Sequence, residues 1–341
     1  MNSAPVVSVI IVNYNGKHLL GDCLDSLREQ TFRDFEVILV DNASSDGSEE
    51  YVRTNYPEVT FVRNEKNLGY GGGNNAGINM ANGTCMVLLN NDTKADPYWL
   101  QHLVRTSETN KKTGMCASRI MNFYHPDIID NAGLLMYKDG IARGRGRLER
   151  DIGRYAKEEE VFFPSGCAGL YKKEMLDDIG LFDEDFFLYL DDVDIGLRGR
   201  IAGWTCMYAP DAVVHHKYSA TTEPYSPLKA FLVERNRIWV VMKYFPLKMV
   251  FMSLIYTSLR YFFQGCGALT GKGASSHLMK SESPLSVLKI VFRAYAAALS
   301  RGFGMLKKRR EAMRIKRVGN AEISSWFRVF GIGVKEVALK E

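Results

Sequence analysis

The sequence predicts an α/β fold, with a doubly wound, mostly parallel sheet and a C-terminal helical extension. Three observations predict it. Short β-branched apolar runs alternate with helical patterns through the first 120 residues, polar residues follow the ends of four such runs, and the chain becomes basic and helical after Pro227. Such alternation is typical of parallel strands joined by right-handed crossovers.

Periodicity places the individual elements. Apolar runs bounded by turn residues predict strands at 6–12, 35–40, 59–62 and 85–89, and a later one at 209–216. Apolar residues at helical spacing predict helices at 17–30, 46–55, 72–81 and 195–202, and Pro97 suits the first turn of a helix at 97–111.

The carboxyl ends of these strands are the expected location of a ligand site. Four of them are followed by polar clusters: Asn13-Tyr14-Asn15, Asp41-Asn42, Arg63-Asn64 and Asn90-Asn91-Asp92. Loops are polar in general, which explains any one cluster. Four clusters on one edge of the sheet favour a binding site there.

Asp92 follows a buried strand and is well placed to hold a divalent cation. Its carboxylate offers the oxygen that Mg²⁺ and Mn²⁺ prefer. One carboxylate is a weak site unless phosphate oxygens and other protein groups complete it. His215 is a candidate second ligand, and the alternative for this residue is a structural histidine.

The densest carboxylate group comprises Asp191, Asp192 and Asp194. Neighbouring carboxylates repel one another, so the pKa of one can rise and let it act as a base near neutral pH. The alternative is an acidic helix start, which the helix dipole favours. Composition alone leaves both open.

Three further segments also have two interpretations. The glycine loop at 69–76 precedes a helix and suits the close approach of a phosphate, although it is a poor dinucleotide fingerprint. Asp41 could accept hydrogen bonds from a base or ribose, or could begin a turn. A basic loop with four arginines at 143–150 either contacts a phosphate or is solvated.

Charge divides the chain. Residues 1–228 hold 23 basic and 33 acidic side chains, whereas residues 229–341 hold 21 basic and 6 acidic ones. We therefore expect two parts, 1–228 and 229–341, that meet different partners. The six cysteines form no Cys-x-x-Cys pair, and Met1 to Pro5 carries no basic residue. These features predict a reduced, cytoplasmic protein without a signal peptide.

The basic part is expected to be helical and amphipathic. Helices are predicted at 231–244, 249–263 and 285–301, with a Gly/Ser-rich linker at 265–283. Its longest uncharged stretch is eleven residues, against the roughly 20 needed to span a bilayer. Apolar faces flanked by Lys and Arg predict helices that lie on an anionic membrane. The alternatives are a helical subdomain packed on the first domain and a dimer interface.

Five ordered motifs carry a family resemblance. They are 7–15, 40–48, 67–74, 88–92, and the pair 180–187 and 191–198. Together they resemble family 2 glycosyltransferases of the GT-A fold over residues 6–245. The last pair looks like the rhamnosyltransferase-type branch.

The resemblance implies a role for each matching residue. The nucleotide-sugar-binding residues would be Asn13, Asn15, Asp41, Asn67, Gly69, Asn74 and Asn91. Asp92 and His215 would hold the metal, in an element whose first carboxylate is replaced by Asn90. Asp192 would be the general base, with Asp191 as its catalytic partner. Asp194 and Gly166 would hold the acceptor or position the base.

The implied reaction is inverting, non-processive transfer of one sugar. Rhamnose is the leading candidate by resemblance alone, from a dTDP- or UDP-linked donor with Mg²⁺ or Mn²⁺. The acceptor would be a hydroxyl of a glycan or polyprenyl-linked oligosaccharide in cell-surface polysaccharide synthesis, at the inner face of the plasma membrane. A homo-oligomer is compatible with this assignment.

Three rival functions compete with this assignment. A catalytically inactive nucleotide-sugar-binding or scaffold protein of the same fold is the main alternative, because the first metal-binding carboxylate is absent. A processive synthase lacks support without the Gln-x-x-Arg-Trp motif. Nucleic-acid binding through 307–310 is disfavoured, since no aromatic residues interleave with the basic ones.

Overall fold

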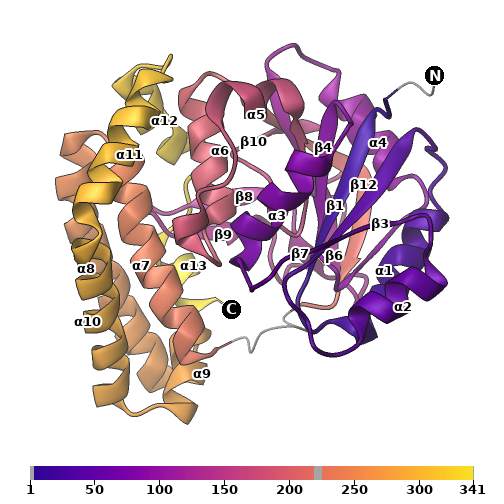
Figure 1. Cartoon of the computed structure of the whole chain (residues 1–341). Helices are drawn as coiled ribbons and strands as arrows, with labels where there is room; N and C mark the ends of the chain where they lie inside the picture. Colours follow the sequence, from indigo (N-terminus) through magenta and orange to yellow (C-terminus); the bar gives the residue numbers. More distant parts are fainter. Residues whose placement is uncertain (1–3, 219–224, 341) are drawn as a thin grey trace. The chain divides into compact units, whose positions relative to one another are not determined.

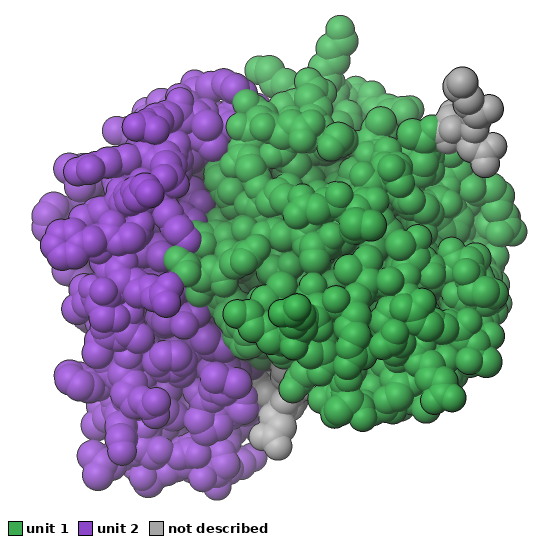
Figure 2. Space-filling model, in the orientation of Figure 1, with its two compact units in different colours: residues 1–134, 144–200, 204–221 green, residues 135–143, 201–203, 222–341 purple. Residues whose placement is uncertain are grey.

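The computed structural model describes residues 4–218 and 225–340, which fall into two units (Figure 2). Unit 1 comprises residues 1–134, 144–200 and 204–221, and unit 2 comprises residues 135–143, 201–203 and 222–341. Residues 1–3, part of the segment Met1–Pro5 for which no signal peptide is predicted, lie outside the described residues.

A mixed, mostly parallel sheet organises unit 1 and confirms the predicted α/β class (Figure 1). Its predicted strands are β1 (Val7–Asn13), β2 (Phe35–Asp41), β3 (Thr60–Arg63) and β4 (Cys85–Leu89). They lie in the order β4-β1-β2-β3 and pair in parallel. Strand β1 pairs with both β2 and β4, which brings the residues that follow these three strands to one edge.

The other half of the sheet contains the strand predicted at 209–216, which begins four residues earlier, at Thr205, together with strands that periodicity did not place. Its strands are β5 (Thr93–Ala95), β6 (Thr113–Asn122), β7 (Ile129–Asn131), β10 (Glu159–Val161), β11 (Ala168–Lys172) and β12 (Thr205–His216). Strand β11 runs antiparallel between β4 and β6, while β12 is parallel to β6. A separate hairpin is formed by β8 (Leu134–Met136) and β9 (Ala142–Gly144).

The helices of unit 1 pack on a sheet that is apolar on both faces. They are α1 (Lys17–Arg28), α2 (Ser48–Asn55), α3 (Gly69–Met80), α4 (Trp99–Ser107), α5 (Lys173–Ile179) and α6 (Asp191–Ile201), with a short 3₁₀ turn, η1 (Glu184–Phe186). Val7, Val9 and Ile11 of β1 belong to the buried core shared with α1 and α4.

Glycines bring α3 close to the opposite face of β1. A Cβ at Gly77 would lie 2.5 Å from Ile10, and a Cβ at Gly73 would lie 2.7 Å from Val12. These positions are four residues apart, so both glycines lie on the same face of α3, and the lack of side chains there lets the helix approach β1. The helix begins at Gly69, three residues before the predicted start.

Unit 2 is helical. Its helices are α7 (Pro227–Tyr244), α8 (Leu247–Thr270), α9 (Gly273–Ser281), α10 (Pro284–Ser300), α11 (Gly302–Arg314), α12 (Asn320–Val329) and α13 (Val334–Leu339). The predicted linker at 265–283 is wrong, because α8 continues to Thr270 and α9 covers Gly273–Ser281. Two short breaks interrupt the helices there, Gly271–Lys272 and Glu282–Ser283. Within the described residues, no helix is long and apolar enough to cross a membrane.

Candidate active site

The ends of β1, β2 and β4 meet through their polar side chains. Asn13 Nδ2 donates to Asp41 Oδ1 at 3.1 Å, and Asn91 Nδ2 donates to Asn13 Oδ1 at 2.8 Å. All three residues are buried. The structure therefore brings together three of the residues predicted to bind the nucleotide sugar, in one hydrogen-bonded row.

The second carboxylate oxygen of Asp41 binds the loop that follows β2. Asp41 Oδ2 accepts from the Ser44 backbone N–H at 2.8 Å and lies 3.5 Å from Arg63. Asn15, which has a left-handed φ of 50°, accepts from the Ser45 N–H at 2.8 Å. Both side chains thus shape the loops at the edge, and their contact with a nucleotide stays a prediction.

The start of α3 is built by the other predicted nucleotide residues. Asn67 Oδ1 accepts from the Gly69 N–H at 2.8 Å, and Asn74 Nδ2 donates to the Tyr70 carbonyl at 3.0 Å. Gly69 has a φ of +73°, and a Cβ there would lie 2.1 Å from the Phe187 carbonyl oxygen. Only glycine fits this approach between α3 and the segment after η1.

The histidine that lies beside Asp92, the predicted metal ligand, is not the predicted one. His216 Nε2 lies 3.3 Å from Asp92 Oδ1, whereas His215 Nε2 lies 3.4 Å from Asp96. Side chains alternate along β12, so the two histidines point to opposite faces of the strand. The placement of His215 beside Asp92 is therefore corrected, and His216 takes that position. Alternation of Cys206, Tyr208, Ala212 and Val214, all buried, was the sequence signal for His216.

His216 is oriented by a second carboxylate. Its Nδ1 is 2.7 Å from Asp130 Oδ2, and Asp130 is also paired with Arg147 of the basic loop. Burial lowers the pKa of His216, but Cys167 and the carboxylates of Asp130 and Asp92 outweigh burial and raise that pKa well above its ordinary value. Asp130 and Arg147 thus belong to this cluster, and no local pattern in the sequence indicated Asp130.

The residues present fit a divalent cation in part. Asp92 Oδ1 is buried and makes no hydrogen bond, although it lies 3.3 Å from His216 Nε2, so it is available as an oxygen ligand. Across residues 4–218 and 225–340, no group of three or more His, Cys, Asp or Glu side chains could hold a metal ion. Asp92 and His216 would therefore need the oxygens of a bound diphosphate to complete a coordination shell.

The acidic run lies in the first turn of α6, and its three carboxylates differ in environment. Asp194 is buried and paired with Arg198 at 2.9 Å. Asp191 is buried, and its Oδ2 makes no hydrogen bond. Asp192 is only partly buried. Burial raises the pKa of both Asp191 and Asp192, and the charge of Asp192 raises that of Asp191 further.

A short segment, Gly166–Cys167, connects the acidic run Asp191–Asp194 with the strand end that carries Asp92. The Gly166 N–H donates to Asp192 Oδ2 at 3.0 Å, and the carbonyl of the next residue, Cys167, accepts from the Asn90 N–H at 2.9 Å. Two consecutive residues thus link the candidate base to the strand end that carries Asp92. Gly166, predicted to hold the acceptor or position the base, contacts Asp192 through its backbone N–H, and its role in the reaction stays a prediction.

Tyr70 is a further residue of this site that the sequence pattern did not indicate. Its hydroxyl donates to the Gly166 carbonyl at 2.5 Å, and its backbone N–H donates to the Phe187 carbonyl at 2.7 Å. Tyr70 therefore connects the glycine-rich helix α3 with the segment that orients Asp192. The contact joins residues 96 positions apart, so no local pattern could have indicated it.

The sequence matches glycosyl transferase family 2 over residues 8–180. It is 28% identical over 273 residues to the N-acetylglucosaminyl-diphospho-decaprenol L-rhamnosyltransferase of Mycobacterium tuberculosis, covering 69% of this chain and 86% of the relative. It is also 28% identical over 193 residues to the uncharacterized glycosyltransferase YwdF of Bacillus subtilis, covering 54% of this chain and 65% of that protein. The predicted resemblance to rhamnosyltransferase-type members is confirmed.

Two solved structures share the fold. GalNAc-T7 with UDP, GalNAc and Mn²⁺ has a TM-score of 0.59 at 18% identity, covering 72% of this chain and 49% of that one. The mannosyltransferase PcManGT of Pyrobaculum calidifontis, with GDP-Man and Mn²⁺, has a TM-score of 0.51 at 16% identity, covering 92% and 86%. The GT-A-like sheet and the family match over half of the sequence lead to one conclusion: the chain belongs to glycosyl transferase family 2.

Proposed function

We propose that this protein transfers one sugar from a nucleoside-diphosphate sugar to an acceptor hydroxyl, with inversion at the anomeric carbon and Asp192 as the general base. The observation that carries the proposal is the Gly166–Cys167 segment, which ties Asp192 to the Asn90–Asp92 strand end. An acceptor base and a diphosphate-binding edge have to be held in fixed geometry for a direct displacement.

The base is suited to its role by its surroundings. An acceptor hydroxyl is a weak nucleophile, so Asp192 would take its proton as the oxygen attacks the anomeric carbon. Burial raises the pKa of Asp192, which makes its carboxylate a better proton acceptor than an exposed one. Burial and the charge of Asp192 raise the pKa of the buried Asp191 well above its ordinary value, which favours the neutral form of Asp191 beside a charged Asp192.

The leaving diphosphate would sit at the edge formed by β1, β2 and β4. Asp92 and His216 would hold a divalent cation there, Mg²⁺ or Mn²⁺, which when bound would neutralise the charge of the leaving group. Asp130 would fix the His216 ring through the 2.7 Å contact to Nδ1. Asn13, Asp41 and Asn91 would contact the nucleotide, with Asn15, Asn67, Gly69 and Asn74 shaping the loops around it.

The donor and acceptor are proposed from the mycobacterial relative, whose name specifies L-rhamnose transfer to a diphospho-decaprenol-linked sugar. By this likeness, the donor is a dTDP- or UDP-linked sugar, rhamnose first. The acceptor is a polyprenyl-diphosphate-linked sugar used in cell-surface polysaccharide synthesis. Such an acceptor would place the protein at the cytoplasmic face of the plasma membrane.

A transfer assay tests the proposal. The purified full chain is incubated with dTDP-rhamnose or UDP-sugars, Mn²⁺ or Mg²⁺, and a short-chain polyprenyl diphospho-N-acetylglucosamine. Formation of a glycosylated lipid, with an inverted anomeric configuration by NMR, supports the assignment. Nucleotide-sugar binding without turnover over all donors would instead favour an inactive protein of the same fold.

A further inference from the structure

We propose that unit 2 carries a surface for an anionic lipid bilayer, made by the outward side of α8, the outward side of α10 and the arginines of α11. The proposal deepens the proposed function by naming where a lipid-borne acceptor would meet the protein. Its test measures lipid binding alone, so it can fail while sugar transfer is retained.

Helix α8 is amphipathic in the reverse sense of an ordinary surface helix. Its polar residues Ser253, Thr257 and Arg260 are only 4%, 5% and 2% exposed. Its large apolar residues face outward instead, with Phe251 at 70% and Phe262 at 64% exposure. Leu247, Leu254, Ile255 and Leu269 are also more than half exposed. A water-exposed apolar face of this length requires a covering partner.

Buried ion pairs fix this orientation. Arg260 donates to Asp139 at 2.6 Å and lies 2.7 Å from Glu234. Arg237 of α7 donates to Thr257 at 3.1 Å and to Glu234 at 3.1 Å. Turning α8 to bury its apolar face would leave these charges without partners, which is strongly unfavourable. The exposed apolar face is therefore built into unit 2.

Helix α10 repeats the pattern. Leu285, Leu288, Phe292 and Leu299 lie at helical spacing and are between 66% and 76% exposed, while Ala294 and Ala298 are buried. Phe303, which follows at the start of α11, is 91% exposed. Figure 1 shows α8 and α10 extending alongside α7 within this unit. Large apolar side chains thus crowd the surface of two long helices.

Charge selects a bilayer over a second copy of the chain. Residues 229–341 hold 21 basic and 6 acidic side chains, and the exposed Lys248, Lys289 and Arg293 flank the apolar residues. A second copy would bring the same excess of positive charge against this surface. Anionic lipid headgroups complement it, and basic residues near such a membrane each strengthen binding.

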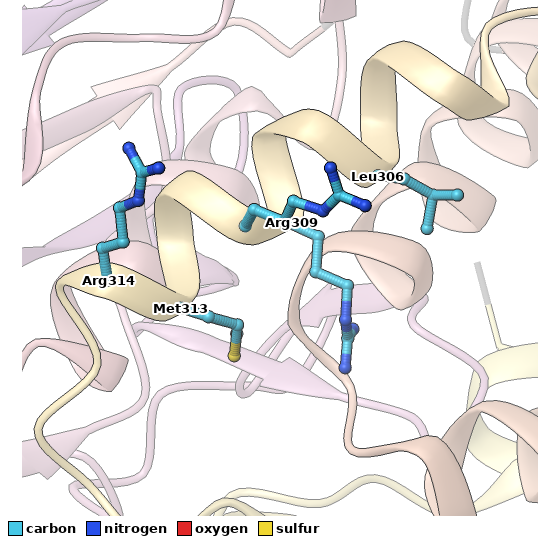
Figure 3. Close-up of a pocket in the computed structure, with 5 residues that line it drawn as sticks. Leu306, Arg309, Met313 and Arg314 are labelled. Atoms are coloured by element: carbon cyan, nitrogen blue, oxygen red, sulfur yellow. The ribbon is translucent and has the colours of Figure 1, made fainter.

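Helix α11 adds a place for the phosphates. Leu306, Arg309, Arg310, Met313 and Arg314 line an open hollow of about 430 Å³. Figure 3 shows side chains of this set, including Arg309 and Arg314, projecting from α11 beside Leu306 and Met313. Arg309 is anchored by a 2.8 Å hydrogen bond to the Met242 carbonyl. One guanidinium group can donate two parallel hydrogen bonds to two oxygens of a phosphate. The apolar side chains of Leu306 and Met313 suit the adjoining glycerol and acyl carbons of a lipid.

Flotation of the full chain with vesicles tests this surface. Vesicles of phosphatidylcholine alone are compared with vesicles that also contain phosphatidylglycerol. We expect binding to the mixed vesicles, weakened by salt because the headgroup attraction is screened. The double variant Phe251→Ser/Phe262→Ser should lose binding by more than about tenfold, since two large apolar side chains no longer enter the bilayer. Arg310→Gln/Arg314→Gln should lose about fivefold per arginine.

Matched variants in unit 1 control for general surface effects. Tyr98→Ser/Tyr124→Ser removes two exposed aromatic residues, at 55% and 67% exposure, and should leave flotation unchanged. A second readout uses Ile255→Trp, whose fluorescence should be quenched by brominated acyl chains. The proposal is overturned if all variants float equally with the vesicles, or if brominated acyl chains do not quench the added fluorescence of the Ile255→Trp variant. A stable dimer in solution that Phe251→Ser/Phe262→Ser converts to monomers overturns it in favour of a second copy.

Discussion

Gly166 holds Asp192 through one backbone hydrogen bond, from the Gly166 N–H to Asp192 Oδ2 at 3.0 Å. The carboxylate is only partly buried, so an acceptor hydroxyl can reach it while the backbone fixes its rotamer. Since Cys167 binds the Asn90 N–H at 2.9 Å, a shift in this segment would displace both the base and the strand end that carries Asp92.

Tyr70→Phe should lower kcat and leave KM for the nucleotide sugar nearly unchanged. The substitution removes the 2.5 Å hydrogen bond to the Gly166 carbonyl and loosens the segment that orients Asp192. One hydrogen bond contributes about 0.5–1.5 kcal/mol, so kcat should fall roughly threefold to tenfold. Steady-state kinetics measure it, with Tyr124→Phe as the exposed control. An unchanged kcat would show that Tyr70 has no positioning role.

His216→Ala and His215→Ala should differ sharply. His216 lies 3.3 Å from Asp92 Oδ1, whereas His215 contacts Asp96 at the other side of the strand. We expect His216→Ala to weaken Mn²⁺ binding in the presence of the nucleoside diphosphate, measured by calorimetry, and His215→Ala to leave it near the wild-type value. Asp130→Asn should weaken Mn²⁺ binding about 10- to 100-fold, as expected for the loss of a carboxylate that orients a ligand histidine. The opposite ranking of the two histidines would restore His215 to the site.

The pH dependence of kcat should reflect the raised pKa of Asp192. Asp192 acts as a base only when deprotonated, and burial raises its pKa above the ordinary value of about 3.9. Activity is therefore expected to be full above the raised pKa and lost as pH falls through it, at a higher pH than an exposed aspartate would give. A pH–rate profile measures this, with circular dichroism over the same range to exclude unfolding. Activity that persists down to the ordinary aspartate pKa contradicts the assignment.

Glu234→Gln should destabilise unit 2. Glu234 is buried between Arg260 and Arg237; although burial opposes it, their charges lower its pKa to about 2. Because the folded-state pKa is depressed, its stabilisation is present above the ordinary glutamate pKa and is lost as pH falls toward 2. Removing one member of a buried ion cluster costs about 3–5 kcal/mol of unfolding free energy.

Urea unfolding at neutral pH measures the effect of Glu234→Gln. Glu336→Gln is the matched control, since Glu336 forms an exposed pair with Lys340 at 3.3 Å and such pairs contribute about 0–1 kcal/mol. Equal stability of the two variants would mean that the buried ion pairs of Glu234, Arg237 and Arg260 do not fix the orientation of α8. The exposed apolar face of α8 would then have another cause.

The first half of the fold could be predicted because its signals are local. Strands β1 to β4 are short apolar runs, and the residues that follow them are polar, so Asn13, Asp41 and Asn91 could be assigned to one edge before any contact was known. Their mutual hydrogen bonds confirm that proximity. The role of each residue toward a nucleotide depends on a ligand and stays a prediction.

The remaining features depend on distant contacts. Asp130 reaches His216 across 86 residues, and Tyr70 reaches Gly166 across 96. Asp139 lies in the hairpin between β8 and β9, yet its carboxylate binds Arg260 of α8. Periodicity cannot tell whether the polar residues Ser253, Thr257 and Arg260 of α8 face water or a buried carboxylate.

The central claim is that Asp192 is the base of a sugar transfer. Sugar transfer by Asp192→Asn is compared with that of Asp191→Asn, while nucleotide-sugar binding is followed by calorimetry in both. The account predicts that Asp192→Asn lowers kcat by about 10²–10⁴-fold with binding retained, because no group remains to take the proton. It predicts that Asp191→Asn stays within about tenfold of wild type, because burial and the charge of Asp192 raise the pKa of Asp191 and favour its neutral form, which an amide resembles. Retained turnover in Asp192→Asn would contradict the account.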